Sequence, residues 1–479
     1  MIIKKLFSLI ILALVLISSS AEIKAFDQNV SDTSVVIESS GLNHSEEHQL
    51  PSVFMVIPFI ILLLMIATGP LFYHHFWEKY YPLISVLLGL VTVFYYLIFL
   101  NDTHSLLHTA TEYISFIALL SSLFVASGGI LIRVDKKSTP WLNAGILLFG
   151  SVIANIIGTT GASMLLIRPF IKINKHRIKP YHIIFFIFLV SNIGGCLTPI
   201  GDPPLFLGFL RGVRFFLVIQ EVWYIWLPTV LLVTAVFIYF DSRNKSDVED
   251  TNEYSGKIEF KGMKNVLYLL VIIISVFIDP AVMSWVPSLS PLPIGLREII
   301  MFSVVVIAYK TASEDILKAN EFNFEPIKEV AYLFVGIFAT MIPALQLISY
   351  EADVLGEKLT PGIFYWATGS LSAFLDNAPT YLNFLSAAMG KFGMNVNLPS
   401  EVLRFEKLHP IYISAVSVAA VFFGAMTYIG NGPNFMVKSI SERSGIRMPS
   451  FFGYMLKYSI PILLPIFTLV WLVFYFGKV

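Results

Sequence analysis

Long apolar segments recur along the whole of this 479-residue chain and constrain its fold more than any other feature. A helix needs about 20 mostly apolar residues to cross the hydrocarbon core of a bilayer. Charged residues make up only 13% of the chain, about half the share that is usual in soluble domains. Spans are expected near 53–72, 82–100, 111–132, 180–209, 222–240, 265–285, 294–309, 327–349, 410–437 and 452–476. The sequence therefore predicts an all-α polytopic membrane protein.

Several classes of function find no support in the composition or in short motifs. The formal net charge is +0, so bulk electrostatics do not indicate nucleic acid as a partner. The single cysteine, Cys196, excludes a disulfide framework within one chain and a metal site built from several cysteines. The sequence contains no zincin motif, no nucleophile elbow and no Walker loop. We therefore expect no enzyme, no cofactor, no structural metal and no direct use of ATP.

The first 25 residues have the pattern of a targeting segment. Lys4 and Lys5 precede an apolar run over 6–17, and small residues follow at 18–21. This pattern predicts a signal peptide, or alternatively a signal anchor that remains as an additional helix. Either alternative places the polar, acidic stretch 26–50 outside as a periplasmic tail, in a multi-pass protein of a bacterial inner membrane.

Two further apolar stretches, 141–169 and 362–389, are interrupted near their centres by Gly, Asn, Pro, Thr or Asp. We interpret each as a re-entrant hairpin that enters and leaves on one side; the alternative is a single crossing helix with polar residues in it. The hairpins place most of the 32 Lys and Arg residues, including the cluster 168–179, on the cytoplasmic side. The predicted topology has about ten or eleven transmembrane helices plus two hairpins.

The two halves of the chain share an internal repeat. Gly-Ser-Val-Ile-Ala at 150–154 matches Gly-Ser-Leu-Ser-Ala at 369–373, and the pattern Thr-x-Ile-Gly-[Asp/Asn]-x-Pro occurs at both 198–204 and 427–433. Five crossings separate the hairpins, so the repeats 53–240 and 265–476 have opposite orientations and are joined by a cytoplasmic linker, 241–264. Inverted repeats with interrupted helices are typical of secondary transporters. The alternative is chance similarity between Gly- and Pro-rich breaks.

The helices 180–209 and 410–437 are predicted to be broken, because proline removes backbone donors and glycine permits unusual dihedral angles. Backbone groups freed at such a break must line a cavity or bind a ligand. Opposed helix ends can bind either a cation or an anion, so the breaks do not determine the sign of the substrate. The residues expected to break helices are Gly201, Pro203, Pro204, Pro379, Gly430, Gly432 and Pro433.

Two acids lie at these interruptions. Asp202 is the deepest acid of the first half and is a predicted ion or substrate ligand, with a helix N-cap as the alternative. Asp376 and Asn377 occupy the tip of the second hairpin, where a capping turn is the alternative. The other candidate ligands are neutral, and each could instead be an interhelical hydrogen-bond partner. These are Asn155, Thr159, Thr160, Asn192, Thr198, Thr380, Thr427, Asn431 and Asn434.

The segments Ser-Asn-Ile-Gly-Gly at 191–195, Thr-Pro-Ile-Gly-Asp-Pro-Pro at 198–204 and Leu-Asp-Asn-Ala-Pro-Thr at 375–380 resemble the ArsB/NhaD branch of the ion transporter superfamily. The resemblance covers about 53–476. That superfamily includes NhaD-type sodium/proton antiporters, arsenite transporters and carriers of citrate or dicarboxylates. The resemblance implies a homodimer with a scaffold domain and a transport domain that moves like an elevator. It also implies roles in activity for Asn192 and Asp202.

The chain departs from both subfamilies that it resembles most. NhaD-type proteins usually have hydroxyl-bearing residues after Gly-Asp, where this chain has Pro203 and Pro204. Carboxylate carriers share the two prolines but typically have a neutral residue at the position of Asp202. The leading hypothesis is a sodium (or lithium)/proton antiporter with a midplane site at the hairpin tips and broken helices. The alternative is a sodium- or proton-coupled citrate or dicarboxylate transporter. A third class, a membrane scaffold or receptor, leaves the paired breaks unexplained.

Overall fold

The structure is a computed structural model that describes residues 50–244, 254–280, 283, 285–287, 294–355 and 359–478. Residues 1–54 and 55–479 form two separate units, and the fold described below is that of the second unit. The predicted targeting segment 1–25 and almost all of the tail 26–50 lie outside the described residues. The same is true of 245–253 in the predicted linker.

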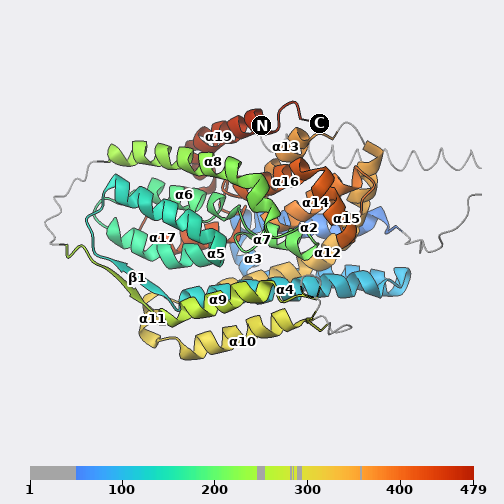
Figure 1. Ribbon diagram of the computed structural model, residues 1–479, viewed down its shortest axis with the longest axis horizontal. Coiled ribbons are helices and arrows are strands. Elements are labelled where there is room, and N and C mark those ends of the chain that lie inside the picture. Colours follow the sequence, from blue (N-terminus) through green and yellow to red (C-terminus); the bar gives the residue numbers. More distant parts are fainter. Residues whose placement is uncertain are drawn as a thin grey trace, which may run out of the picture. The chain divides into compact units, whose positions relative to one another are not determined.

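Helices make up most of the described part of the unit (Figure 1). Each predicted span contains one helix or more, so the all-α membrane fold is confirmed. The helices are α2 Ile57–Phe72, α3 His74–Tyr95, α4 Thr103–Gly128, α5 Pro140–Ile173, α6 Pro180–Leu189, α7 Pro203–Leu210, α8 Leu217–Ser242, α9 Lys264–Val276, α10 Leu296–Thr311, α11 Glu314–Ala319, α12 Glu325–Leu355, α13 Pro361–Ser372, α14 Asn377–Gly390, α15 Pro399–Leu408, α16 Pro410–Gly424, α17 Gly432–Arg443, α18 Phe451–Tyr454 and α19 Ile460–Phe474.

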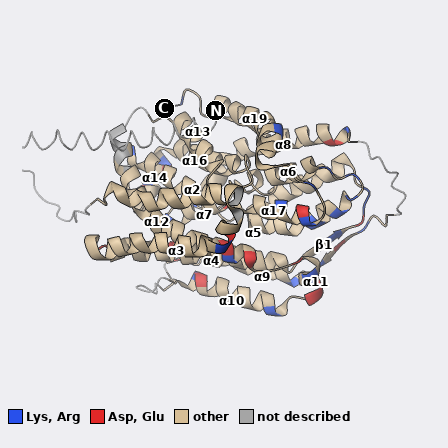
Figure 2. Ribbon diagram, turned by 180° about the vertical axis from the view of Figure 1, so that it is seen from behind, with Lys and Arg blue, Asp and Glu red and all other residues tan. Residues whose placement is uncertain are grey.

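Six helices of the described residues are long and apolar enough to cross a membrane, or seven if the bent pair α15 and α16 counts as one span. Fewer helices pass this length test than the sequence led us to expect, because several predicted spans are built from shorter pieces. Shorter apolar helical stretches lie at 53–69, 180–195 and 264–276, and they include all or part of α2, α6 and α9. The end of the unit that carries β1, α11 and α17 has basic residues on all three elements, with acidic residues among them, and is predicted to face the cytoplasm (Figure 2).

A two-stranded antiparallel ribbon was not predicted from the sequence. Strand β1, Leu131–Val134, follows α4, and strand β2, Ile258–Lys261, lies in the predicted linker just before α9. Arg133 pairs with Glu259 in the register of the two strands. The ribbon holds the loop after α4 and the described part of the linker on the same side of the unit, as the predicted topology requires.

The α5 segment folds back on itself. A straight helix of its 34 residues would be about 51 Å long, at about 1.5 Å per residue. Asn143 near its start and Asn174 just after its end nevertheless exchange two side-chain hydrogen bonds, at 2.8 and 2.9 Å. The reversal occurs at Gly158, whose φ of 77° and ψ of 154° are not helical. We therefore describe α5 as a helical hairpin with its tip at Gly158.

The second hairpin consists of α13 and α14. Its two outer ends are joined by Lys391, whose Nζ donates to the carbonyl oxygen of Leu359 at 2.9 Å. Phe364 of the first arm and Phe384 of the second form an edge-to-face contact at 6.4 Å. The outer ends of this hairpin lie toward the opposite end of the unit from α6 and α17, which neighbour the first hairpin (Figure 1). The two hairpins are thus inverted relative to each other.

Both predicted broken helices are interrupted. The first consists of α6 and α7, separated by residues 190–202, and the second consists of α16 and α17, separated by 425–431. In the first break, the backbone passes so close to itself that a Cβ at Gly201 would lie 2.1 Å from the carbonyl oxygen of Gly195. Only glycine fits this crossing. The crossing brings Asp202 next to the tip of the first hairpin.

Candidate functional site

Asp202 is the point at which both hairpins and both broken helices meet. Its Oδ1 accepts hydrogen bonds from Thr159 Oγ1 at 2.6 Å and from Asn431 Nδ2 at 3.0 Å. Its Oδ2 accepts one from Asn377 Nδ2 at 2.5 Å. Thr159 lies at the first hairpin tip, Asn377 at the second, and Asn431 in the second break. Because Asp202 is only 1% exposed, these neutral donors replace the water that an ionised carboxylate would otherwise bind.

The repeated Thr-x-Ile-Gly pattern has the same structural role in both halves. Thr198 Oγ1 donates to the carbonyl oxygen of Asn155 in the first hairpin at 2.5 Å, and Thr427 Oγ1 donates to that of Ala373 in the second at 2.6 Å. Each threonine oxygen also accepts from a glycine N–H three residues later, Gly201 or Gly430. Thr198 and Thr427 therefore hold each break against its own hairpin, and among the described residues neither forms a side-chain hydrogen bond with the Asp202 carboxylate.

Three of the predicted asparagines hold the breaks in place. Asn192 Nδ2 donates to Asn434 Oδ1 at 2.6 Å and so joins the first break to the first turn of α17. Asn434 in turn donates to the carbonyl oxygens of Gly424 and Thr427. Asn155 donates to the carbonyl oxygen of Gly194 at 2.6 Å. Among the described residues, the buried Oδ1 atoms of Asn192 and Asn377 have no hydrogen-bond partner, so acceptor capacity remains near the site.

Asp376 lies at the N-terminus of α14 and acts as its cap. Its Oδ1 accepts from the N–H of Ala378 at 3.0 Å, and its carbonyl oxygen accepts from Thr380 Oγ1 at 2.8 Å. The capping turn considered from the sequence is thus present. In the described structure, no hydrogen bond links Asp376, Thr380 or Thr160 to the Asp202 carboxylate. Of the two predicted acids, Asp202 thus belongs to the hydrogen-bonded cluster with Thr159, Asn377 and Asn431, whereas Asp376 caps α14.

A small cavity with a volume of about 20 Å³ lies beside Asp202. One wall is formed by the first hairpin tip and the first break, including Thr159 and Thr160. The opposite wall is apolar and comes mainly from α4, with Phe116, Leu119, Leu120, Leu123 and Phe124. Among the described residues that line the cavity, only Asp202 is ionisable. Sequence reasoning missed α4 as a wall of the site, because an apolar helical face against a cavity has the same pattern as one against lipid.

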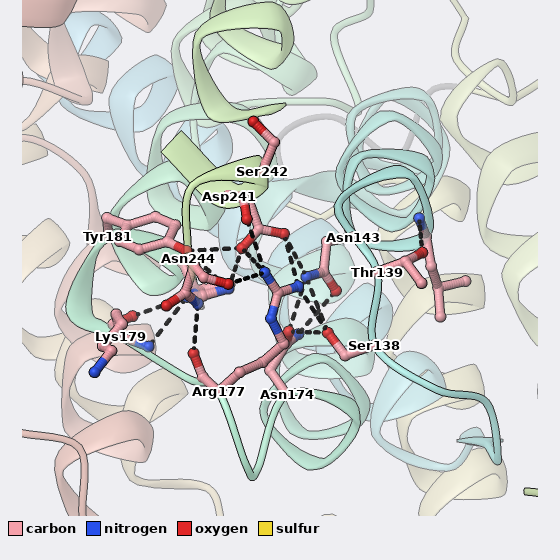
Figure 3. A network of polar contacts seen from close by, with 12 residues as sticks. Ser138, Thr139, Asn143, Asn174, Arg177, Lys179, Tyr181, Asp241, Ser242 and Asn244 are labelled. Carbon is pink, nitrogen blue, oxygen red and sulfur yellow. Dashed lines mark hydrogen bonds and ion pairs between the residues drawn. The ribbon is translucent and has the colours of Figure 1, made fainter. Parts of the chain in front are cut away.

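A second buried polar network fixes the base of the first hairpin (Figure 3). The fully buried Asp241 at the end of α8 accepts from Arg177 Nη2 at 2.9 Å and from Tyr181 OH at 2.7 Å. Its carboxylate also binds Asn143 Nδ2 at 3.0 Å and His182 Nε2 at 2.9 Å. The network joins both ends of α5 to the start of α6. The sequence predicts Asp241 as the first residue of the linker 241–264, and this role at the base of the hairpin was not predicted.

The donors around Asp202 do not form a typical site for a bound transition metal. In the part of the chain that the structure describes, no three His, Cys, Asp or Glu side chains are grouped so that they could hold a metal ion. The site offers one carboxylate, amides and hydroxyls, which are hard oxygen-rich ligands. Such ligands suit protons and hard cations better than soft metals.

Two inverted hairpins whose tips meet two broken helices at a buried carboxylate define a multi-pass membrane protein of the secondary-transporter class. Residues 47–475 match a family described as "Putative citrate transport", and the chain belongs to this citrate-transporter-like family. The match includes both hairpins and both breaks. No curated protein matches the chain at a significant level.

Proposed function

We propose that this chain is an antiporter that exchanges sodium or lithium ions for protons, with Asp202 as the residue for which the two compete. The observation that carries the proposal is the convergence of four elements on one buried carboxylate. Thr159, Asn377 and Asn431 bring both hairpins and the second break to Asp202. A change in the charge of this one group therefore acts on all four elements at once.

The charges around the site favour a cation over a carboxylate substrate. All hydrogen bonds to Asp202 among the described residues come from neutral groups, and the cavity lining contains no Lys, Arg or His. A multiply charged anion in this cavity would face Asp202 without a cationic side chain to balance it. Burial of an uncompensated charge is strongly unfavourable. A monovalent cation or a proton would instead neutralise the buried carboxylate.

Competition at one carboxylate is sufficient to couple the two fluxes. A cation at Asp202 needs oxygen ligands, and rotation of an asparagine amide replaces its N–H donor with its carbonyl oxygen. Asn377 is suited to this exchange, because its Oδ1 is buried and has no hydrogen-bond partner among the described residues. Thr159 Oγ1 can likewise offer a lone pair to a cation. Proton and cation would then bind in alternation at the same group.

The test uses the full chain in everted vesicles that carry a proton gradient. Addition of sodium or lithium should collapse the gradient, and Asp202→Asn should abolish that collapse. The matched control is Asp315→Asn, which changes an exposed acid on α11. Undiminished sodium-induced collapse in the Asp202→Asn chain would contradict the proposal.

The second candidate is a sodium- or proton-coupled carrier of citrate or a dicarboxylate, and the match to the citrate-transporter-like family favours it. In that case Asn155, Thr159, Thr160, Asn377 and Thr380 would hold the substrate, and helix N-termini would supply partial positive charge. Uptake of labelled citrate into proteoliposomes, with and without sodium, distinguishes the two candidates. A chain that moves neither citrate nor cations would instead fit a scaffold or receptor. The homodimer and the bacterial inner membrane remain part of the proposal.

A further inference from the structure

The short helix α7 connects the candidate site to a second charged group. Asp202 is the N-cap residue of α7 and Arg211 is its C-cap residue. The helix has eight residues, so it separates its two ends by only about 12 Å. Six residues, 205–210, lie between the two prolines at its start and the C-cap, and we treat this short helix as a piece that moves as a rigid body. A displacement of Arg211 is therefore transmitted to Asp202.

Arg211 forms a buried ion pair with Glu112 of α4. Its Nη2 donates to Glu112 Oε2 at 2.8 Å, and its Nε lies 2.5 Å from Glu112 Oε1. Arg211 is 3% exposed and Glu112 is 4% exposed. Two neighbours complete the cluster: Asn397 accepts from Arg211 Nη1, and His108 Nδ1 lies 3.8 Å from Glu112 Oε2. The contact between Nη2 and Oε2 is a charge-assisted hydrogen bond, which is stronger than a hydrogen bond between neutral groups.

Glu112 belongs to the same face of α4 that forms the wall of the cavity. Residues three, four, seven and eight positions apart share one face of a helix. Phe116, Leu119 and Leu120 follow Glu112 at these spacings and line the cavity beside Asp202. The Glu112–Arg211 pair thus joins the apolar wall of the cavity to the helix that carries the candidate ligand. Movement of α7 along or away from α4 must break this pair.

We infer that the Glu112–Arg211 pair is a latch, which holds α7 against α4 and keeps Asp202 next to the cavity. Loss of one partner leaves the other charge buried and unpaired, which is strongly unfavourable, so the paired arrangement is favoured. The latch controls how often the cavity between α7 and α4 opens. This inference rests on the proposed function in one respect: Asp202, the proposed binding residue, is the group that opening of the cavity exposes.

The test measures opening without any transport. Because Cys196 is the only cysteine of the chain, a Cys196→Ser background allows a single reporter, Leu119→Cys, to be placed on the cavity wall. Leu119 is 3% exposed in the latched arrangement. In the full chain reconstituted in liposomes, the rate of labelling by N-ethylmaleimide reports the population of the open arrangement. Glu112→Gln and Arg211→Gln should each raise that rate about tenfold.

The matched control is Arg214→Gln. Arg214 lies three residues beyond Arg211 and pairs with Glu406 of α15, not with α4. This control should leave the labelling rate of Leu119→Cys unchanged. An unchanged rate in Glu112→Gln, or an equal increase in Arg214→Gln, would overturn the inference.

A second measurement covers the case in which the single variants fold poorly. The exchanged pair Glu112→Arg with Arg211→Glu restores opposite charges and should return labelling to within about threefold of the parent rate. If the exchanged pair is folded but labels as fast as the single variants, the latch is excluded. Sodium and citrate assays of the Asp202→Asn chain are independent of this result. A failure of the proposed cation exchange would therefore not change the labelling result. A failure of the latch would likewise not change the result of the transport assays.

Discussion

Asn377 Nδ2 lies 2.5 Å from Asp202 Oδ2, although the two residues are 175 positions apart in the chain. Asn377 starts the second arm of the second hairpin, and Asp202 ends the first break. Each half of the inverted repeat therefore supplies part of one hydrogen-bonded cluster. The candidate site is formed only when the halves pack together, and neither repeat contains it alone.

The two adjacent threonines at the first hairpin tip should differ in importance. Thr159 donates to Asp202 and is 1% exposed, whereas Thr160 lines the cavity without such a bond. A hydrogen bond to a charged group contributes about 1.5–3 kcal/mol. If the site exchanges cations, Thr159→Val should raise the sodium concentration for half-maximal exchange by about tenfold or more. Sodium titration of the proton-gradient collapse measures this value.

Thr160→Val is the matched control for that experiment, because it makes the same chemical change at the next position. It should alter the sodium titration by less than about threefold. Equal effects of both substitutions would contradict a special role for the Thr159 hydroxyl.

Asp376 offers a test that separates capping from ion binding. Its carboxylate accepts from the N–H of Ala378, a role that asparagine fills about as well as aspartate. Asp376→Asn should therefore keep the fold and measurable exchange, while Asp376→Ala should destabilise α14 by about 1 kcal/mol. Thermal unfolding in detergent and vesicle exchange check the two effects. Complete loss of exchange in a well-folded Asp376→Asn chain would show instead that its charge is required.

The sequence was informative about helices and breaks because both depend on local properties. Apolar runs predicted the helical spans, and the Gly and Pro residues of 198–204 and 427–433 predicted the interruptions. The shared threonine of these motifs also predicted equivalent geometry, which Thr198 and Thr427 now display. Such features are encoded over a few neighbouring residues, so a single sequence suffices to find them.

Several features that depend on distant pairing were not predicted. The ribbon of β1 and β2 joins segments 130 positions apart, at Leu131 and Lys261, and each strand has only four residues. Prediction of the ion pair between Asp241 and Arg177 likewise requires knowledge of which helices are neighbours. The same is true of the cavity wall formed by α4. Asp376 and Asp202 were both predicted to be ligands because both lie at interruptions of helices. Position along the chain, however, does not specify the direction of a side chain.

The backbone conformation of Gly158 should be essential for the first hairpin tip. Its φ of 77° and ψ of 154° fall in a region that is essentially limited to glycine, at a cost of about 1–3 kcal/mol for other residues. A Cβ there would also lie 3.3 Å from the carbonyl oxygen of Ile200. Gly158→Ala should therefore lower the unfolding midpoint and weaken exchange, because the tip positions Thr159.

Gly145→Ala, in the first arm of the same hairpin, is the matched control. A Cβ at Gly145 meets no atom within 4 Å, and alanine is favoured over glycine inside a helix by about 0.5–1 kcal/mol. This substitution should leave the unfolding midpoint unchanged or raise it. A similar loss of stability in both variants would argue against a special requirement at the tip.

The base of the first hairpin should depend strongly on the Asp241 network. Arg177 and Asp241 form an ion pair whose side chains are 11% and 0% exposed, and removal of one partner of such a pair costs about 3–5 kcal/mol. Arg177→Gln should therefore lower the thermal unfolding midpoint in detergent clearly. The matched control is Lys318→Gln, which breaks the ion pair of Lys318 with Glu314. The two side chains are 75% and 84% exposed, so this substitution should lower the free energy of unfolding by at most about 1 kcal/mol.

The same network holds the two ends of α5 together through Asn143 and Asn174. Arg177→Gln should therefore also reduce exchange at temperatures where the chain is still folded. If Arg177→Gln and Lys318→Gln gave equal midpoints, the network would not be what anchors the hairpin that carries Thr159.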